Sequence, residues 1–301
     1  SRIITLFLHY NSLLIGSFSI MNNENFNAGN TPAPTNNAPL DTLTFLKEPR
    51  AVDAGEGVNW ISQSWALVKE KLGMWILINI VLFALIFIIS MIPFLNLLIT
   101  FITPIFLGGI IAICENQRKT GQAEIGLLFA GFQQKFSTLF AVGAINFAAN
   151  LVGMIIAFII GGSAIFGLLM ENNQYGGPSD AAILASSGTF ILAGIVMAIA
   201  ALVGTALTWF APALVMNHEF KVGEAISASL QAVKKNILPG ILFFIVIAIL
   251  LVVSAIPLGL GLLISMPIMY ATYYSTYRSL FFSEVKQNQN TQAPQNNSII
   301  Q

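Results

Sequence analysis

Long apolar runs, separated by short polar segments, dominate the chain. Six such runs cover residues 72–92, 94–114, 139–170, 181–216, 237–256 and 258–282. A helix needs about 20 apolar residues to cross the hydrocarbon core of a bilayer, and each run is long enough. Pro93 and Pro257 mark tight turns inside two longer apolar stretches, because proline cannot continue a helix. The pattern predicts an all-α, polytopic membrane protein with six transmembrane helices arranged as three hairpins.

A shorter amphipathic segment precedes each predicted hairpin. In residues 58–72, 125–136 and 222–237, apolar residues recur at helical spacing and polar residues occupy the opposite face. Such helices are expected to lie in the headgroup plane on the cytoplasmic side, with Trp60 and Trp65 as interfacial anchors. The alternative is that they are cytoplasmic extensions of the spans, packed on neighbouring helices.

The first and last predicted hairpins resemble each other in sequence. The letters ISQS and VK in residues 61–69 align with ISAS and VK in residues 226–234 at a constant offset. Downstream, each hairpin has an Ile-Pro turn followed by a second proline, Pro104 in the first and Pro267 in the last. Pro212 occupies the corresponding place in a looser middle section. Three related units are therefore predicted.

The distribution of cations predicts the orientation. Twelve of the 13 Lys and Arg residues, all except Arg2, flank the predicted spans on one side. They are Lys47, Arg50, Lys69, Lys71, Arg118, Lys119, Lys135, Lys221, Lys234, Lys235, Arg278 and Lys286. The opposite connections, around Pro93, residues 171–180 and Pro257, contain none. Cytoplasmic flanks of membrane proteins are enriched in Lys and Arg. Both termini are therefore predicted to be cytoplasmic.

The two ends of the chain are polar and rich in Asn, Gln and Pro. Residues 1–57 and 286–301 are predicted to be disordered, and residues 58–285 to form the six-helix domain. Residues 3–20 are apolar and resemble a signal peptide or a seventh span. Either would carry the cations of residues 47–71 to the cation-free side, so we expect residues 1–20 to come from a misassigned start or an upstream fusion.

Composition narrows the classes of protein. Hydrophobic residues make up 56% of the chain and charged residues 9%, whereas soluble domains have about 25% charged residues. A water-soluble protein is excluded. The formal net charge is zero, so no basic excess favours nucleic acid as a partner.

The centres of the predicted spans lack ionisable residues, which usually mark ion or proton pathways. Their polar side chains are amides and hydroxyls: Asn79, Asn146, Asn150, Thr205, Thr208 and Ser254. Asn146 and Asn150 lie one turn apart on the same face. Hydrogen bonding between helices is the favoured interpretation, and a solute site is the alternative.

No enzyme motif is present. His9 lies in the doubtful leader, and the pair His218-Glu219 has no second His or nucleophile motif near it, so it is interpreted as a solvated flank. Cys114 ends an apolar run and is expected to act as a small hydrophobe. We expect no catalytic, cofactor-binding or metal-binding residue. A stripe of Tyr270, Tyr273, Tyr274 and Tyr277 ending at Arg278 is typical of an interfacial belt, with a lipid-headgroup site as the alternative.

Several segments resemble a family of uncharacterised inner-membrane proteins of Gram-negative bacteria. The resemblance rests on residues 60–65, residues 128–132, the segment from Ala211 to Asn236, and residues 274–278, and it covers about residues 50–285. It implies a six-helix protein of the bacterial inner membrane. The family has no established activity, so no residue inherits a role. Related bundles include membrane domains attached to glycerophosphodiester phosphodiesterases, whose catalytic domain this chain has no room for.

The leading hypothesis is a non-enzymatic membrane protein that acts in envelope maintenance or by binding another membrane protein or a second copy of itself. Small residues such as Ala144, Ala148, Gly194 and Ala198 would allow close helix contacts. The alternative is a transporter or channel for an uncharged or amphipathic solute, using the asparagines and the proline-bearing helices.

The third and fourth runs are too long for a bilayer. They are expected to project beyond the outer surface, with residues 163–170 packed on residues 181–188. Gly161-Gly162 and residues 186–188 are the expected places for a break or bend, because these residues are small and form helices poorly.

Overall fold

The computed structural model describes residues 43–92, 95–175, 177 and 179–284, and these are almost entirely helical. The predicted all-α class is confirmed. In chain order the helices are α2 (Glu56–Glu70), α3 (Leu72–Ser90), α4 (Asn96–Thr120), a 3-10 turn η1 (Ile125–Phe129), α5 (Ala130–Gln134), α6 (Phe136–Tyr175), α7 (Asp180–Thr208), α8 (Ala211–Asn217), α9 (Val222–Lys235), α10 (Ile237–Ala255) and α11 (Leu262–Phe281). Two short strands, β1 (Leu43–Phe45) and β2 (Phe282–Glu284), pair antiparallel.

Among the described residues, five segments are helical, long and apolar enough to cross a membrane. They are Leu72–Ser90, Leu98–Thr120, Phe136–Asn172, Asp180–Asn217 and Ile237–Ala255. The sixth predicted run corresponds to α11, which does not reach the same apolar content. The predicted turn at Pro93 lies outside the described residues.

Each predicted amphipathic segment forms helix that ends at a backbone break before the following long helix. The break residues are Lys71, Lys135 and Asn236, with φ values of −131°, −136° and −130° and ψ values of 40°, 30° and 40°. Three nearly identical breaks at the same place in each unit support the repeat predicted from sequence. A break lets an amphipathic helix change direction and bury its apolar face elsewhere.

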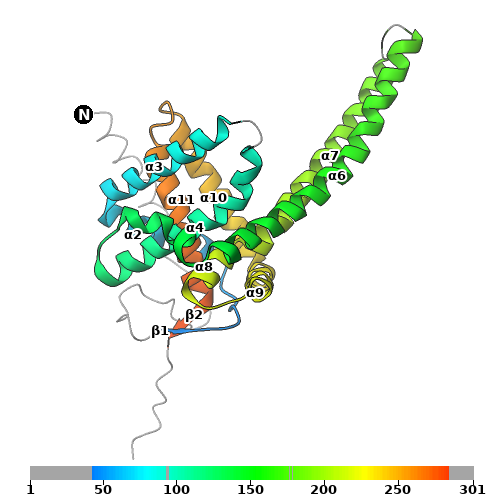
Figure 1. Ribbon diagram of the computed structural model, residues 1–301. Coiled ribbons are helices and arrows are strands. Elements are labelled where there is room, and N and C mark those ends of the chain that lie inside the picture. Colours follow the sequence, from blue (N-terminus) through cyan, green and yellow to red (C-terminus); the bar gives the residue numbers. More distant parts are fainter. Residues whose placement is uncertain (1–42, 93–94, 176, 178, 285–301) are drawn as a thin grey trace, which may run out of the picture.

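The short helices pack on the proline-bearing helices in a cyclic order. The η1–α5 segment packs on α4, α9 packs on α7 and α8, and α2 packs on α11, with α10 alongside it (Figure 1). Each short helix thus contacts the second long helix of the preceding unit, and the first unit closes the ring on the last. Protein covers most of the apolar faces, as in the alternative interpretation: Trp60 is 3% exposed, although Phe129 and Phe136 remain 38% and 49% exposed. The ring leaves α4, α8 and α11 in mutual contact.

The predicted continuous helix over residues 181–216 is interrupted at Trp209 and Phe210. Pro212 lacks an N–H group and its ring crowds the carbonyl one turn earlier, so the helix restarts as α8. The buried hydroxyl of Ser229 enters the break: it donates to the carbonyl of Ala206 (2.9 Å) and accepts from the N–H of Phe210 (3.2 Å). These two backbone groups would bond each other in an unbroken helix. Ser229 of α9 therefore supplies the hydrogen bonds that these backbone groups lose at the break.

Helices α6 and α7 lie side by side and project from the remaining helices as one long hairpin (Figure 1). The expected bends at Gly161-Gly162 and residues 186–188 are wrong, because both helices continue through them. At Gly161 a Cβ atom would lie 3.8 Å from the ring of Phe190 in α7, whereas Gly162 and Gly188 have open space around them. Close approach occurs at Gly153, where a Cβ atom would lie 2.2 Å from the Cβ of Ala200, while Gly194 faces open space.

Part of the segment predicted to be disordered is ordered. Its residues 1–42 lie outside the described residues, as do residues 285–301, but residues 43–55 cross the end of α11. β1 pairs with β2, and the side chain of Arg50 donates to the carbonyl of Ser279 (2.7 Å). Asn236 accepts from the N–H of Val52 (2.9 Å). Backbone pairing with a segment more than 200 residues away orders this stretch, and local composition does not reveal it.

Candidate functional site

The C-terminal ends of α4, α8 and α11 meet and bring together five side chains that we call the polar cluster. These are Glu115, Arg118, His218, Tyr274 and Tyr277. They come from the three units of the repeat, one helix from each. The cyclic packing therefore creates the cluster, because it places the ends of these three helices against one another.

Glu115, Arg118 and Tyr274 form a closed triangle of hydrogen bonds. Glu115 accepts from the hydroxyl of Tyr274 (2.5 Å) and from Nη2 of Arg118 (2.6 Å), and Nε of Arg118 donates to the same hydroxyl (2.8 Å). The acid and guanidinium side chains are 19% and 21% exposed. An ion pair this enclosed is maintained only when its remaining hydrogen-bonding capacity is satisfied. The triangle provides that and ties α4 to α11.

His218 and Tyr277 form the second half of the polar cluster. Nε2 of the imidazole lies 2.6 Å from the hydroxyl of Tyr277, and the ring stacks on Phe45 of β1 with centroids 3.4 Å apart. Burial lowers the pKa of His218, and the negative charge of Glu115 partly opposes this shift. The imidazole is therefore neutral at pH 7 and joins α8, α11 and β1 by a hydrogen bond and a stacked ring.

The polar cluster has a positively charged rim. The ammonium of Lys119 lies 3.1 Å from Glu115, and the Lys119 side chain is 61% exposed. Across the described residues there is no group of three His, Cys, Asp or Glu side chains that could hold a metal ion. The oxygens of Glu115 already accept hydrogen bonds from Arg118 and Tyr274. The polar cluster therefore links helices, and the exposed ammonium of Lys119 lies beside it.

The structure changes the interpretation of the aromatic stripe and of His218. Tyr274 and Tyr277 are buried (4% and 1% exposed), so they do not form the predicted interfacial belt. Tyr273 stacks on Trp209, with centroids 4.2 Å apart. His218 is half-buried within the polar cluster, while its neighbour Glu219 is exposed as predicted for a solvated flank. Helical spacing identified one face of α11, but that face is turned toward other helices.

The predicted asparagine pair lies at the contact between α6 and α7. Asn146 donates to the hydroxyl of Thr208 (3.0 Å), and Asn150 donates to the side-chain oxygen of Asn146 (3.0 Å). Thr208 donates in turn to the carbonyl of Gly204 (2.8 Å). The favoured interpretation, hydrogen bonding between helices, is confirmed.

The other predicted polar positions stay apart from the polar cluster. Asn79 and Ser254 are buried on α3 and α10, and the hydroxyl of Ser254 has no hydrogen-bond partner in the described part of the chain. Cys114 is fully buried, as expected for a small hydrophobe. Pro104 and Pro267 lie inside α4 and α11.

The sequence did not indicate that Glu115, Arg118 and Gln117 make buried polar contacts between helices. Gln117 is 2% exposed, accepts from the indole N–H of Trp75 (2.8 Å) and donates to the carbonyl of Leu67 (2.7 Å). All three residues lie in the polar end of an apolar run, where they resemble an ordinary charged flank. The acid and base three residues apart were the available signal for an ion pair.

Comparisons with protein-family profiles, curated proteins and solved structures find no match to this chain.

Proposed function

We propose that this chain is a multi-pass protein of the bacterial inner membrane with six transmembrane helices in three hairpins. α11 is the sixth span. Its 20 residues correspond to about 30 Å of helix, the thickness of the hydrocarbon core. Its lower apolar content has a physical explanation, because its hydroxyl side chains are buried against other helices and do not face lipid. The buried hydroxyl residues are Ser265, Thr272, Ser275, Thr276 and Ser279.

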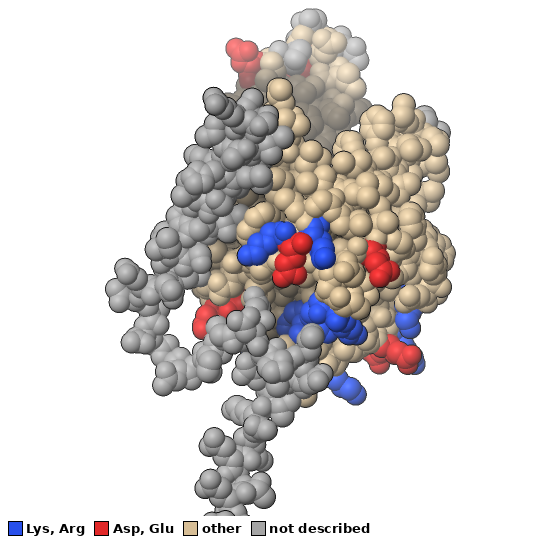
Figure 2. Space-filling view, turned by 90° about the vertical axis from the view of Figure 1, so that its left-hand side faces the viewer, with Lys and Arg blue, Asp and Glu red and all other residues tan. Residues whose placement is uncertain are grey.

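The distribution of charge supports an orientation with both termini in the cytoplasm. On the face shown in Figure 2, the Lys and Arg side chains gather in the lower part, together with acidic residues, below a broad uncharged surface. Basic residues end α2, α4, α9 and α11, whereas the connection between α6 and α7 is flanked by Glu171 and Asp180. This is the asymmetry expected of cytoplasmic and external ends.

Reporter fusions test the orientation. A periplasm-active reporter fused after Gly177 is expected to be active, and fusions after Thr120, Val222 and Gln287 are expected to be inactive, because cations flank only the latter sites. A cytoplasm-active reporter at the same four positions is the control and should give the reverse pattern. External activity from the Thr120 fusion would overturn the orientation.

We assign the protein a non-enzymatic role in the envelope, in which the α6–α7 hairpin binds another membrane protein. The observation that carries this proposal is the exposure of the hairpin. In the most apolar 18-residue stretches of Phe136–Asn172 and Asp180–Asn217, 11% and 6% of residues are buried, against 50% for Leu98–Thr120. Two of the three asparagines that a solute path would use, Asn146 and Asn150, are already bonded within the hairpin, which supports binding over transport.

The length of the hairpin favours a protein partner over lipid alone. α6 has 40 residues, which corresponds to about 60 Å of helix against a hydrocarbon core of about 30 Å. Even at a tilt of about 40° it would extend about 46 Å along the membrane normal. Near the tip of the hairpin, Phe166 of α6 and Leu184 of α7 are 64% and 76% exposed. A large apolar surface beyond the hydrocarbon core is typical of a site that binds another protein.

Site-specific photocrosslinking in intact membranes tests this role. A photoreactive amino acid at Phe166 or Leu184 is expected to give a discrete adduct with one protein, identified by mass spectrometry. The control position is Phe83 on α3, which is 68% exposed but lies within the span, so it should yield lipid adducts. Lipid adducts alone at all three positions would contradict a protein partner at the hairpin.

A further inference from the structure

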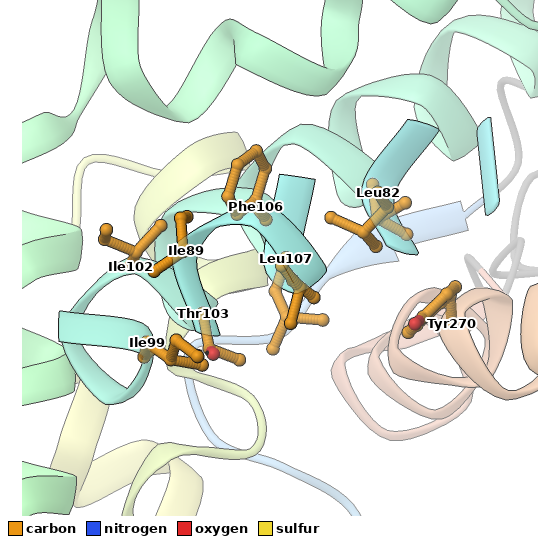
Figure 3. Close-up of a pocket in the computed structure, with 10 residues that line it drawn as sticks. Leu82, Ile89, Ile99, Ile102, Thr103, Phe106, Leu107 and Tyr270 are labelled. Atoms are coloured by element: carbon orange, nitrogen blue, oxygen red, sulfur yellow. Dashed lines mark hydrogen bonds between the residues drawn. The ribbon is translucent and has the colours of Figure 1, made fainter. Parts of the chain in front are cut away.

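An apolar hollow lies between α3 and α4, with one residue of α11 to one side of it (Figure 3). α3 contributes Leu82, Ile86 and Ile89, α4 contributes one face from Ile99 to Ile110, and α11 contributes Tyr270, which lies across from Leu107. The hollow has a cavity volume of about 60 Å³, and the whole space between the lining atoms, open solvent included, is about 420 Å³. It extends along about 16 Å of α4, close to half the thickness of a hydrocarbon core.

The packing of the two helices keeps the hollow open. On its other side α4 is held by close contacts without side chains: Cβ atoms built on Gly109 and Gly143 would lie 2.0 Å from the carbonyl oxygen of Leu128 and 2.7 Å from the Cα of Phe101. α3 is held at its cytoplasmic end by the hydrogen bond between Trp75 and Gln117. These contacts hold α4 and the Trp75 end of α3 in place beside the hollow.

The chemistry of the lining excludes water as a stable occupant. The hydroxyl of Thr103 donates to the carbonyl of Ile99 (2.7 Å), which leaves the Tyr270 hydroxyl as the one polar group in the lining without a hydrogen bond to a described residue. A buried water needs two to four polar partners. If hydrocarbon does not fill an apolar space of this kind, the side chains that line it lose van der Waals contacts.

We propose that this hollow is a lipid site that holds one acyl chain of a membrane phospholipid. The inference rests on the proposed membrane location, which makes phospholipid the surrounding solvent. The hollow runs from the middle of α3 and α4 toward the ends that adjoin the external connection, at Ile89 and Ile99. The acyl chain therefore enters from the external leaflet, with its headgroup at the level of that connection and its methyl end near Tyr270.

Photolabelling of the whole protein in liposomes tests the site without any substitution. The probe is a phosphatidylethanolamine with a diazirine near the end of one acyl chain. Labelling is expected to be concentrated on the peptides that contain Leu82–Ile89 and Ile99–Ile110, at least several-fold above that of the equally apolar α6–α7 hairpin. If all exposed spans are labelled to the same extent, the proposed site is wrong. Absence of label from every span would instead contradict the proposed membrane location.

Native mass spectrometry of delipidated protein titrated with unlabelled phosphatidylethanolamine provides the second test. Leu107→Trp fills the hollow and is expected to lower occupancy by the first lipid roughly tenfold, because several methylene groups lose their burial. The matched control, Leu98→Trp, changes an exposed residue of the same helix outside the hollow and should bind as wild type does. Unchanged binding by folded Leu107→Trp protein, or an equal loss in both variants, overturns the proposal.

Discussion

A Gly109→Ala variant is expected to unfold at a clearly lower temperature than the wild-type protein in detergent. The added Cβ atom would lie 2.0 Å from the carbonyl oxygen of Leu128, a distance that forces the backbones of α4 and η1 apart. Overpacking of this kind costs about 1–3 kcal/mol, and contact with backbone atoms favours the upper end of that range. Thermal unfolding followed by intrinsic fluorescence measures the loss. Gly131→Ala should behave alike, because its Cβ atom would lie 2.2 Å from the carbonyl oxygen of Ile105.

The matched control is Gly240→Ala in α10. A Cβ atom there has open space around it, so alanine gains about 1 kcal/mol of helix propensity without a clash. Gly240→Ala should therefore unfold at the same temperature as wild type or higher. If Gly109→Ala also raised the unfolding temperature, propensity would dominate at both sites, and the close contact between α4 and η1 would not be essential to the fold.

A Glu115→Ala variant is expected to lose about 2–4 kcal/mol of stability, since removal of one partner leaves the other charge enclosed and unpaired. The Arg118 side chain is 21% exposed, so water compensates for part of the lost carboxylate and the fully buried extreme does not apply. The hydroxyl of Tyr274 loses its acceptor in the same variant. The measurement is the shift in thermal unfolding, together with the change in tyrosine absorbance of the folded protein.

A double-mutant cycle separates the ion pair from general disruption. Arg118→Met together with Glu115→Ala removes both charges and should recover most of the stability lost in Glu115→Ala alone. Glu70→Gln, at an exposed position near the end of α2, should have little effect. Simple additivity of the two single losses in the cycle would refute the coupling between Glu115 and Arg118 that holds α4 and α11 together.

Local patterns predicted most of the helices. Apolar runs of sufficient length placed α3 and α10 within about two residues of their observed ends, because both helices are apolar all round and lie between polar or proline-containing segments. Helical spacing also located α2 and α9, and the one-turn separation of Asn146 and Asn150 predicted their bonding at a helix contact. These features depend on residues close together in the chain.

Contacts between distant segments were decided by the tertiary structure alone. The sequence indicated three related units, but the ring in which α2 packs on α11 depends on which apolar faces fit one another, and periodicity carries no information about the partner of a face. That ring buries Tyr277 and places Glu115 beside Tyr274, although their local sequences are typical of a membrane edge. The order of residues 43–55 arises in the same way, from pairing with the far end of the chain. The sequence by itself determined the helical class and the segments suited to a membrane, because burial of apolar residues is a local requirement. The polar cluster and the hollow needed the packed structure, because they are built from helices whose contacts are fixed by shape.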